Sequence, residues 1–290
     1  MRETARAGVE RERLWPFPHL PKTVAARHAV SDLALRPFGL YEGDLNVDFD
    51  RTPRPVLVTH LLERCTRSTQ RESVEQSVFW DLPVGKRIEC LLTLLLSEAE
   101  SEITFAFRCP NTTCGEVSEI AISIEEVAAL QEDAYGVDRV EVPVGSEVLA
   151  LRRPTGSDQL AWLKSAFTDS EAARRAMIRT LLVNDNENVV AHGEVPRDEW
   201  LDSIDEAMED HDPLVNFKLK VRCPSCETTN LIAVDLEELS LRGLRNAQLR
   251  LLASVHRLAA RYHWSEQQIF AVPSWRRAQY LSLIANERIQ

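Results

Sequence analysis

The sequence predicts an α+β fold in which one unit of strand, cysteine turn, strand and helix is present twice. Residues 105–127 read FAFRCPNTTCGEVSEIAISIEEV, and residues 219–239 read LKVRCPSCETTNLIAVDLEEL. Each begins with alternating apolar residues, which are typical of strands, and passes through Arg-Cys-Pro and a second cysteine to a Glu-Glu pair. Cys114 precedes Glu125 by 11 positions, as Cys226 precedes Glu237. This equal spacing indicates an internal duplication.

The composition is that of a globular protein without a generally basic surface. The chain has 290 residues, of which 44% are hydrophobic and 27% charged, and a formal net charge of -11. Nucleic-acid binding requires clustered Lys and Arg to neutralise phosphates, so we expect no nucleic-acid partner. The chain shows no apolar leader and no run of about 18 uncharged apolar residues. We therefore expect no membrane insertion and a cytoplasmic location.

Residues 1–70 are predicted to form an extended N-terminal arm with short helices, because prolines interrupt its apolar stretches. These prolines are Pro16, Pro18, Pro21, Pro37, Pro53 and Pro55. Residues 71–240 are predicted to form the duplicated domain that carries the cysteines. Its first helix is expected from Val84 or Gly85 to Ser97, because the segment KRIECLLTLLLSEAE is rich in helix formers and holds no Pro or Gly.

Strands are predicted on both sides of each cysteine pair. In the first unit, apolar residues alternate at Ile103, Phe105 and Phe107 and again at Ile120, Ile122 and Ile124. A helix is expected from Glu125 onward. In the second unit, the leading strand carries Phe217, Leu219 and Val221 on one face.

An acidic helical insertion is expected at about residues 157–213, after the strand-like segment EVPVGSEVLALRRP. Thr155 and Asp158 have the spacing of a capping box, and the segment EAARRAMIRTLLV predicts an amphipathic helix. Residues 185–212 contain 11 Asp or Glu, with Arg197 as the one basic residue. This composition predicts a solvated helix around EWLDSIDEAMED.

Residues 241–290 are predicted to form a basic C-terminal helical segment, with eight arginines against Glu266 and Glu287. Apolar residues recur at helical spacing over residues 251–262, Ser265 and Gln268 form a second capping box, and a last helix follows Pro273. The acidic insertion could pair with this basic segment, either within one chain or between chains.

Four cysteines are predicted to bind one zinc ion: Cys109, Cys114, Cys223 and Cys226. Structural zinc takes four ligands in a tetrahedron, and thiolates on two strand turns supply them. The C-x2-C spacing of the second pair is usual, whereas the C-x4-C spacing of the first lies at the wide end. Neither pair saturates the ion alone, so two zinc-ribbon-like units would share it. Four thiolates leave no open position, which makes the zinc structural.

Two alternatives compete with zinc: each pair could be reduced thiols or a local disulfide. A thioredoxin-like redox site is disfavoured, because Cys226 is followed by polar ETTN and a strand, not by the start of a helix. Cys65 and Cys90 have no close partner, and Cys90 lies among apolar helix residues where we expect it to be buried. No nucleotide-binding, metalloprotease or serine-hydrolase motif occurs in the sequence, so we do not expect an enzyme.

Three stretches in a fixed order resemble a known family. The first is WDLPVGKRIECLLTLLL followed by FRCPNTTCGEVSEIAIS, the second is VPVGSEVLALRRPTGSDQLAWL, and the third is VHRLAARYHWSEQQIFAVPSWRRAQYLSLI. Together they are similar to the baseplate-hub family of T4-type contractile phage tails, found also in phage-tail-like contractile injection systems. The resemblance spans roughly residues 75–290. The wide C-x4-C spacing and the acidic insertion depart from the family.

The resemblance implies a non-enzymatic role. A protein of this family is expected to be a structural or assembly component of the baseplate or hub, with other baseplate, hub or tape-measure proteins as its partners. The alternative that the cysteine pairs and the basic C-terminal segment suggest is a zinc-ribbon adaptor that binds nucleic acid or a transcription complex.

Overall fold

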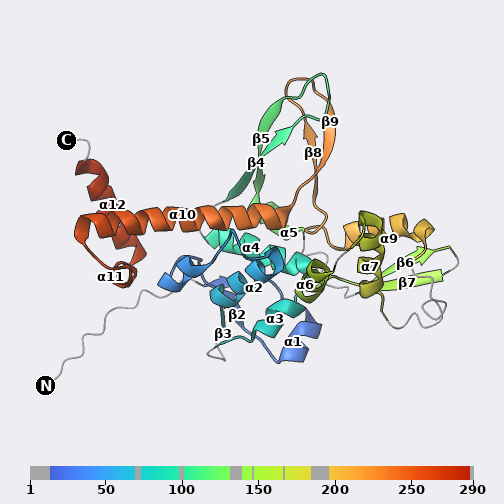
Figure 1. Cartoon of the computed structure of the whole chain (residues 1–290), viewed down its shortest axis with the longest axis horizontal. Helices are drawn as coiled ribbons and strands as arrows, with labels where there is room; N and C mark the ends of the chain where they lie inside the picture. Colours follow the sequence, from blue (N-terminus) through green and yellow to red (C-terminus); the bar gives the residue numbers. More distant parts are fainter. Residues whose placement is uncertain are drawn as a thin grey trace.

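A computed structural model describes residues 14–68, 73–97, 101–130, 139–145, 147–165, 167–183 and 196–287. It confirms a mixed α+β fold with small antiparallel sheets (Figure 1). The first elements are β1 (Trp15–Pro16), α1 (Lys22–His28), β2 (Leu33–Leu35), η1 (Glu42–Asn46), α2 (Arg54–Cys65), β3 (Thr66–Ser68), α3 (Gln76–Asp81) and α4 (Val84–Ser97). The central ones are β4 (Glu102–Arg108), β5 (Val117–Ser123), α5 (Ile124–Ala129), β6 (Arg139–Val144), β7 (Glu147–Arg152), α6 (Gly156–Lys164), α7 (Ser170–Leu181) and α9 (Asp198–His211). The last ones are β8 (Lys218–Arg222), β9 (Thr229–Ala233), α10 (Leu236–Tyr262), α11 (Glu266–Ala271) and α12 (Ser274–Glu287).

α4 is the centre of the main apolar core. Its bounds are those predicted, and Leu91, Leu92 and Leu94 are completely buried. Helices α2, α5 and α10 pack against it. α4 is buried on nearly every side, and the charged residues this encloses are paired, as Lys86 is with Glu89. Cys90 is also completely buried here, as expected, and its desolvation raises the pKa of its thiol well above the usual range.

The first 70 residues are not an extended arm where the structure describes them. α2 buries Val58, Leu61 and Leu62 completely in the main core. β3, which follows α2, completes the sheet of β1 and β2. The prolines mislead because Pro53 and Pro55 lie at the start of α2, where a residue without a backbone N–H costs the helix nothing.

A buried ion pair holds the N-terminal part together, and a glutamine of α10 fastens this part to the helix. Arg36 binds both carboxylate oxygens of Asp44 at 2.7 Å, and both side chains are at most 3% exposed. The Nε2 amide of Gln248 on α10 donates to the backbone carbonyls of Asp44, Leu45 and Val47. These bonds satisfy polar groups that burial would otherwise leave without water.

Only part of the predicted acidic insertion, α7 and α9, packs with the preceding strands β6 and β7 in a second unit, which we call the acidic lobe and define as β6, β7, α7 and α9. α6 packs on α2 and α3 instead, and residues 184–195 of the insertion lie outside the described residues. The apolar cluster of the acidic lobe contains Leu149 and Leu151 of β7 and Ile204 of α9. The helix predicted around EWLDSIDEAMED is confirmed, but only one face is solvated, because Trp200 and Leu201 are also buried. α6 begins at the predicted capping box.

α10 is a single helix of 27 residues that connects the second cysteine unit to the C-terminus. The expected domain boundary between residues 240 and 241 therefore falls inside a continuous helix. We define residues 242–287 as the C-terminal unit, in which α11 and α12 fold back against α10. Their small core includes stacked rings of Tyr262 and Trp264, with Tyr280 edge-on to both.

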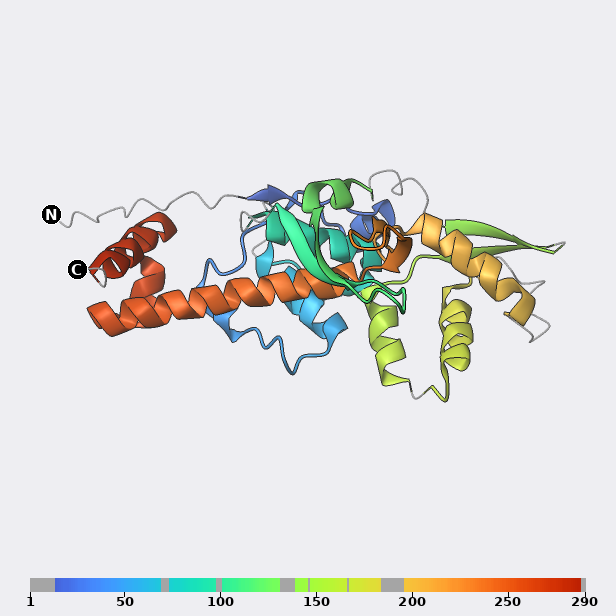
Figure 2. The ribbon, with the colours of Figure 1, turned by 90° about the horizontal axis from the view of Figure 1, so that it is seen from above.

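The molecule is elongated along α10. The C-terminal unit and the acidic lobe lie at opposite ends, with the main core between them (Figures 1 and 2). None of the described helices is both long enough and apolar enough to cross a membrane.

Candidate metal centre

Two hairpins carry the predicted zinc ligands and stand side by side above α10 (Figure 1). In the first, β4 pairs with β5 from Glu102 opposite Ser123 to Arg108 opposite Val117. In the second, β8 pairs with β9 and ends with Arg222 opposite Thr229. In both hairpins the pairing of the strands therefore stops one residue before the first cysteine. The two cysteines of each pair thus lie in the turn at the tip of their hairpin.

The two turns close in the same way. The backbone N–H of Cys109 donates to Glu116 at 2.8 Å, and that of Cys223 donates to Thr228 at 3.0 Å. The residue after the second cysteine is left-handed in both turns, with φ of 62° at Gly115 and 59° at Glu227. A left-handed residue reverses the chain here, and glycine accommodates it more easily than glutamate does.

The wider first turn adds its two extra residues without disturbing this closure. Asn111 accepts hydrogen bonds from the backbone N–H groups of Cys114 and Gly115, and the shorter turn instead bonds Glu227 to Cys223. Both turns thus deliver two thiols to one side of a hairpin tip. The C-x4-C spacing is compatible with a metal site for this reason.

The four predicted ligands converge at one point, with all their sulfurs within 4.8 Å of one another. The shortest contacts cross between hairpins, with 3.6 Å from Cys109 to Cys226 and 3.8 Å from Cys114 to Cys223. Four sulfurs at about 2.3 Å from one ion would lie about 3.8 Å apart in a tetrahedron. The donors therefore fit a single zinc ion. No other group of three His, Cys, Asp or Glu in the described parts of the chain comes close enough to hold a metal.

Two of the four cysteines are buried, and the other two are partly exposed to solvent. Cys109 and Cys223 are 3% and 1% exposed, and Phe107 packs beside them. Cys114 and Cys226 are half-buried. None of the six cysteines is disulfide-bonded, so the alternative of a local disulfide within each pair does not occur in this structure.

The thiols do not ionise independently. Hydrogen bonds to the side chain and backbone of Thr228 lower the pKa of Cys226 to about 6. A backbone hydrogen bond with Asn111 opposes the change at Cys109, but desolvation and the neighbouring thiols raise its pKa to about 12. One thiolate is thus stabilised by the surrounding S–H groups, and a second negative charge is disfavoured. A divalent cation is what would allow all four to be thiolates.

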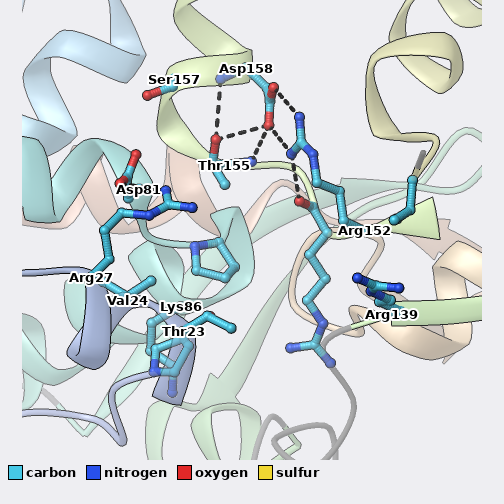
Figure 3. Close-up of a pocket in the computed structure, with 14 residues that line it drawn as sticks. Thr23, Val24, Arg27, Asp81, Lys86, Arg139, Arg152, Thr155, Ser157 and Asp158 are labelled. Carbon is cyan, nitrogen blue, oxygen red and sulfur yellow. Dashed lines mark hydrogen bonds and ion pairs between the residues drawn. The ribbon is translucent and has the colours of Figure 1, made fainter. Parts of the chain in front are cut away.

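A second polar site lies where α1, α4, α6 and the β6–β7 hairpin meet, in a cleft of about 640 Å³ (Figure 3). Its cations outnumber its carboxylates: Arg27, Lys86, Arg139, Arg152 and Arg153 against Asp81 and Asp158. No sequence motif points to this cleft. The adjacent basic residues at 86–87 and 152–153 were the available signal, but only the fold brings them together.

The cleft is held by an ion pair that fastens α6 to β7. Arg152 donates to both oxygens of Asp158 at 2.6 and 2.8 Å, and Thr155 donates to the same carboxylate twice at 2.8 Å (Figure 3). Burial opposes ionisation, but these bonds lower the pKa of Asp158 below its usual value. The described lining holds no histidine and no cysteine, so it offers no imidazole base and no thiol nucleophile.

No protein-family model, curated protein or solved structure matches this chain. The resemblance to the baseplate-hub family therefore rests on the three sequence stretches and stays a prediction.

Proposed function

We propose that this protein is a non-enzymatic structural or assembly component of the baseplate or hub of a contractile phage-tail-like particle. The cysteine cluster carries the non-enzymatic part of the proposal. It has four ligands and no position left for a substrate, so a bound zinc would serve the fold. The contractile-tail part rests on the three ordered stretches between residues 80 and 284.

A single structural zinc ion joins the two hairpins in this proposal. The ligand pairs that touch across the hairpins are 117 and 109 residues apart in sequence. Closing such long loops is entropically costly, so a metal that binds only the closed form stabilises it. Zinc is favoured over harder cations because every donor is a sulfur.

The two hairpins and the helices after them are zinc-ribbon-like units that arose by duplication. Ser123 caps α5 by accepting a hydrogen bond from Glu126, and Asp235 caps α10 by accepting one from Glu238. Both caps lie nine positions after the second cysteine of their unit. Two unrelated hairpins have no reason to share this spacing as well as the closure of the turn.

The partners in this proposal are other baseplate, hub or tape-measure proteins, met in the cytoplasm during assembly or in the assembled particle. Deleting the gene and imaging the particles by electron microscopy tests it. We expect incomplete or absent baseplates, restored by the wild-type gene and not by a Cys226→Ser variant. Normal sheathed particles with complete, functional baseplates in the deletion strain would rule the proposal out.

A zinc-ribbon adaptor is the second candidate, favoured by the arginines of the C-terminal unit. Exposed arginines such as Arg242 and Arg257 lie along α10 and could contact phosphates. Binding of DNA or RNA that weakens steeply with added salt would support the adaptor. The net charge of -11 leads us to expect no such binding.

A further inference from the structure

The C-terminal unit is strongly basic. Residues 242–287 contain seven arginines, whereas Glu266 and Glu287 are the acidic residues. Arg257, Arg261 and Arg276 are exposed near the end of the molecule that α11 and α12 form (Figure 1). This end therefore carries a positive field in a chain that is acidic as a whole.

The opposite end is acidic. α7 and α9 together contain eight Asp or Glu and three Arg. Arg174 and Arg175 of α7 form ion pairs with part of the α9 carboxylates. Glu206 and Asp210 are exposed on the same helix, and the excess of negative charge remains.

These two surfaces cannot meet within one chain. α10 carries α11 and α12 beyond one end of the main core, and the acidic lobe lies beyond that core on the other side (Figures 1 and 2). Of the two pairings that the sequence allowed, the one within a chain is therefore excluded. The pairing between chains is left.

Both ends also expose apolar side chains that an interface would bury. In the C-terminal unit, Trp275 and Leu283 are each 55% exposed. At the other end, Val148 of β7 in the acidic lobe is 55% exposed. Tryptophan and arginine are the residues that most often dominate binding at protein interfaces.

We propose that the protein associates with itself head to tail, the basic C-terminal unit of one copy docking on the acidic lobe of the next. The contact is heterologous, so each copy keeps one free end of each kind. Repetition then produces a closed ring or an open filament, according to the rotation at each contact. This proposal depends on the placement of charge, not on the contractile-tail role.

Two charge-reversal variants of the full chain test the proposal. The basic-end variant carries Arg257→Glu with Arg261→Glu, and the acidic-end variant carries Glu206→Lys with Asp210→Lys. Lys22→Glu with Arg51→Glu is the control for the first, since both residues are exposed between the two ends. Each zinc-loaded protein is examined by sedimentation velocity over a range of concentrations at low and high ionic strength.

We expect the wild type and the control to self-associate at low salt, and each end variant to lose at least about tenfold in association constant. An equimolar mixture of the two end variants should associate again, because the acidic lobe of one is intact and the C-terminal unit of the other is intact. A wild type that stays monomeric at all concentrations would overturn the proposal. An end variant that dimerises with the association constant of the wild type would also overturn it, since that would indicate a contact between like ends.

Discussion

Cys226 is the ligand whose loss we expect to show the shared site most clearly. It lies 3.6 Å from Cys109 on the other hairpin and is half-buried, so its replacement leaves the packing of the core unchanged. With Cys226→Ser the site loses one of four thiolates. We predict that zinc content falls from one ion per chain to near zero and that the melting temperature falls by several degrees. Metal analysis and thermal unfolding measure the two effects.

Cys65→Ala is the matched control for that experiment. Cys65 is completely buried in the main core and far from the cluster, so its truncation should cost about 1 kcal/mol of stability while zinc stays at one ion per chain. A Cys226→Ser protein with full zinc and unchanged melting would show that the two cysteine pairs do not share an ion.

Asp158 provides a prediction of pH dependence. Its hydrogen bonds from Arg152 and Thr155 lower its pKa in the folded state, so ionised Asp158 stabilises the fold. That contribution is fully present above the unfolded-state pKa and is lost as the pH falls through the lower, folded-state pKa. We predict that Asp158→Asn costs about 1–2 kcal/mol near neutral pH and progressively less in acid.

Urea unfolding of wild type and variant at several pH values measures this difference. Acid also releases zinc from cysteine sites, but it does so from both proteins, and distant effects of this kind cancel in the comparison. Asp210→Asn is the control, since Asp210 is exposed and should give a small difference at every pH. A cost for Asp158→Asn that does not change with pH would mean that its charge is not what stabilises the fold.

At the level of single elements, the sequence predicted best where a local signal decides the structure. α4 was predicted because the segment KRIECLLTLLLSEAE is rich in helix formers and holds no Pro or Gly. The capping boxes at Thr155 and Ser265 were predicted because the cap depends on side chains three positions apart. β4 and β5 were predicted because apolar residues alternate along each of them, which is also a local signal.

Elements were missed where contacts distant in sequence decide. α2 is an exception, because Val58, Leu61 and Leu62, all completely buried, have the i, i+3, i+4 spacing of an amphipathic helix, and the prolines around them outweighed that local signal. The predicted domain boundary divided α10, because the net charge of the sequence changes from acidic to basic at residue 241. Charge on an exposed face does not end a helix. Gly243 lies inside α10, and its missing side chain lets Leu95 of α4 approach the backbone.

Gly156 at the start of α6 has a similar role. A Cβ there would overlap Nη1 of Arg87 and lie 2.7 Å from its Cζ. The Arg87 guanidinium is completely buried and donates to Thr59, to the carbonyl of Phe79 and to that of Pro55. Moving it would break bonds that satisfy a buried charge.

We predict that Gly156→Ala destabilises the protein by about 3–5 kcal/mol, the cost of disrupting a buried charged network. Helix propensity alone predicts the opposite sign, since alanine is favoured over glycine in helices by about 1 kcal/mol. Denaturant unfolding distinguishes the two. Ser157→Ala, one position along and exposed, is the control and should cost no more than about 1 kcal/mol, the loss of its exposed hydrogen bond to the Trp80 carbonyl. A Gly156→Ala protein as stable as wild type would show that Arg87 can move freely.

Across the whole molecule, the meeting of the four cysteines was predictable and its setting was not. The four cysteines that meet were identified because they lie in two closely spaced pairs and because the same unit is repeated around each pair. What the sequence does not reveal is that the tips pack in a cluster of their own around Phe107, separate from the main core around α4. Periodicity identifies the buried face of an element, but it does not identify the element that covers that face.

This separation predicts how the protein responds when the metal is removed. Ile103 and Ile122 at the bases of β4 and β5 belong to the main core, so the bases are held without the ion. The tips are held together across the hairpins by the four cysteines. Chelating zinc from the native protein should therefore open the tips alone, with faster amide hydrogen exchange at residues 109–117 and 223–229. Exchange in α2 and α4 should accelerate far less, only by the loss of global stability that the lower melting temperature reports, because their protection depends on opening the main core. Faster exchange spread equally over α4 and both tips would instead mean that the zinc supports the whole fold as one cooperative unit.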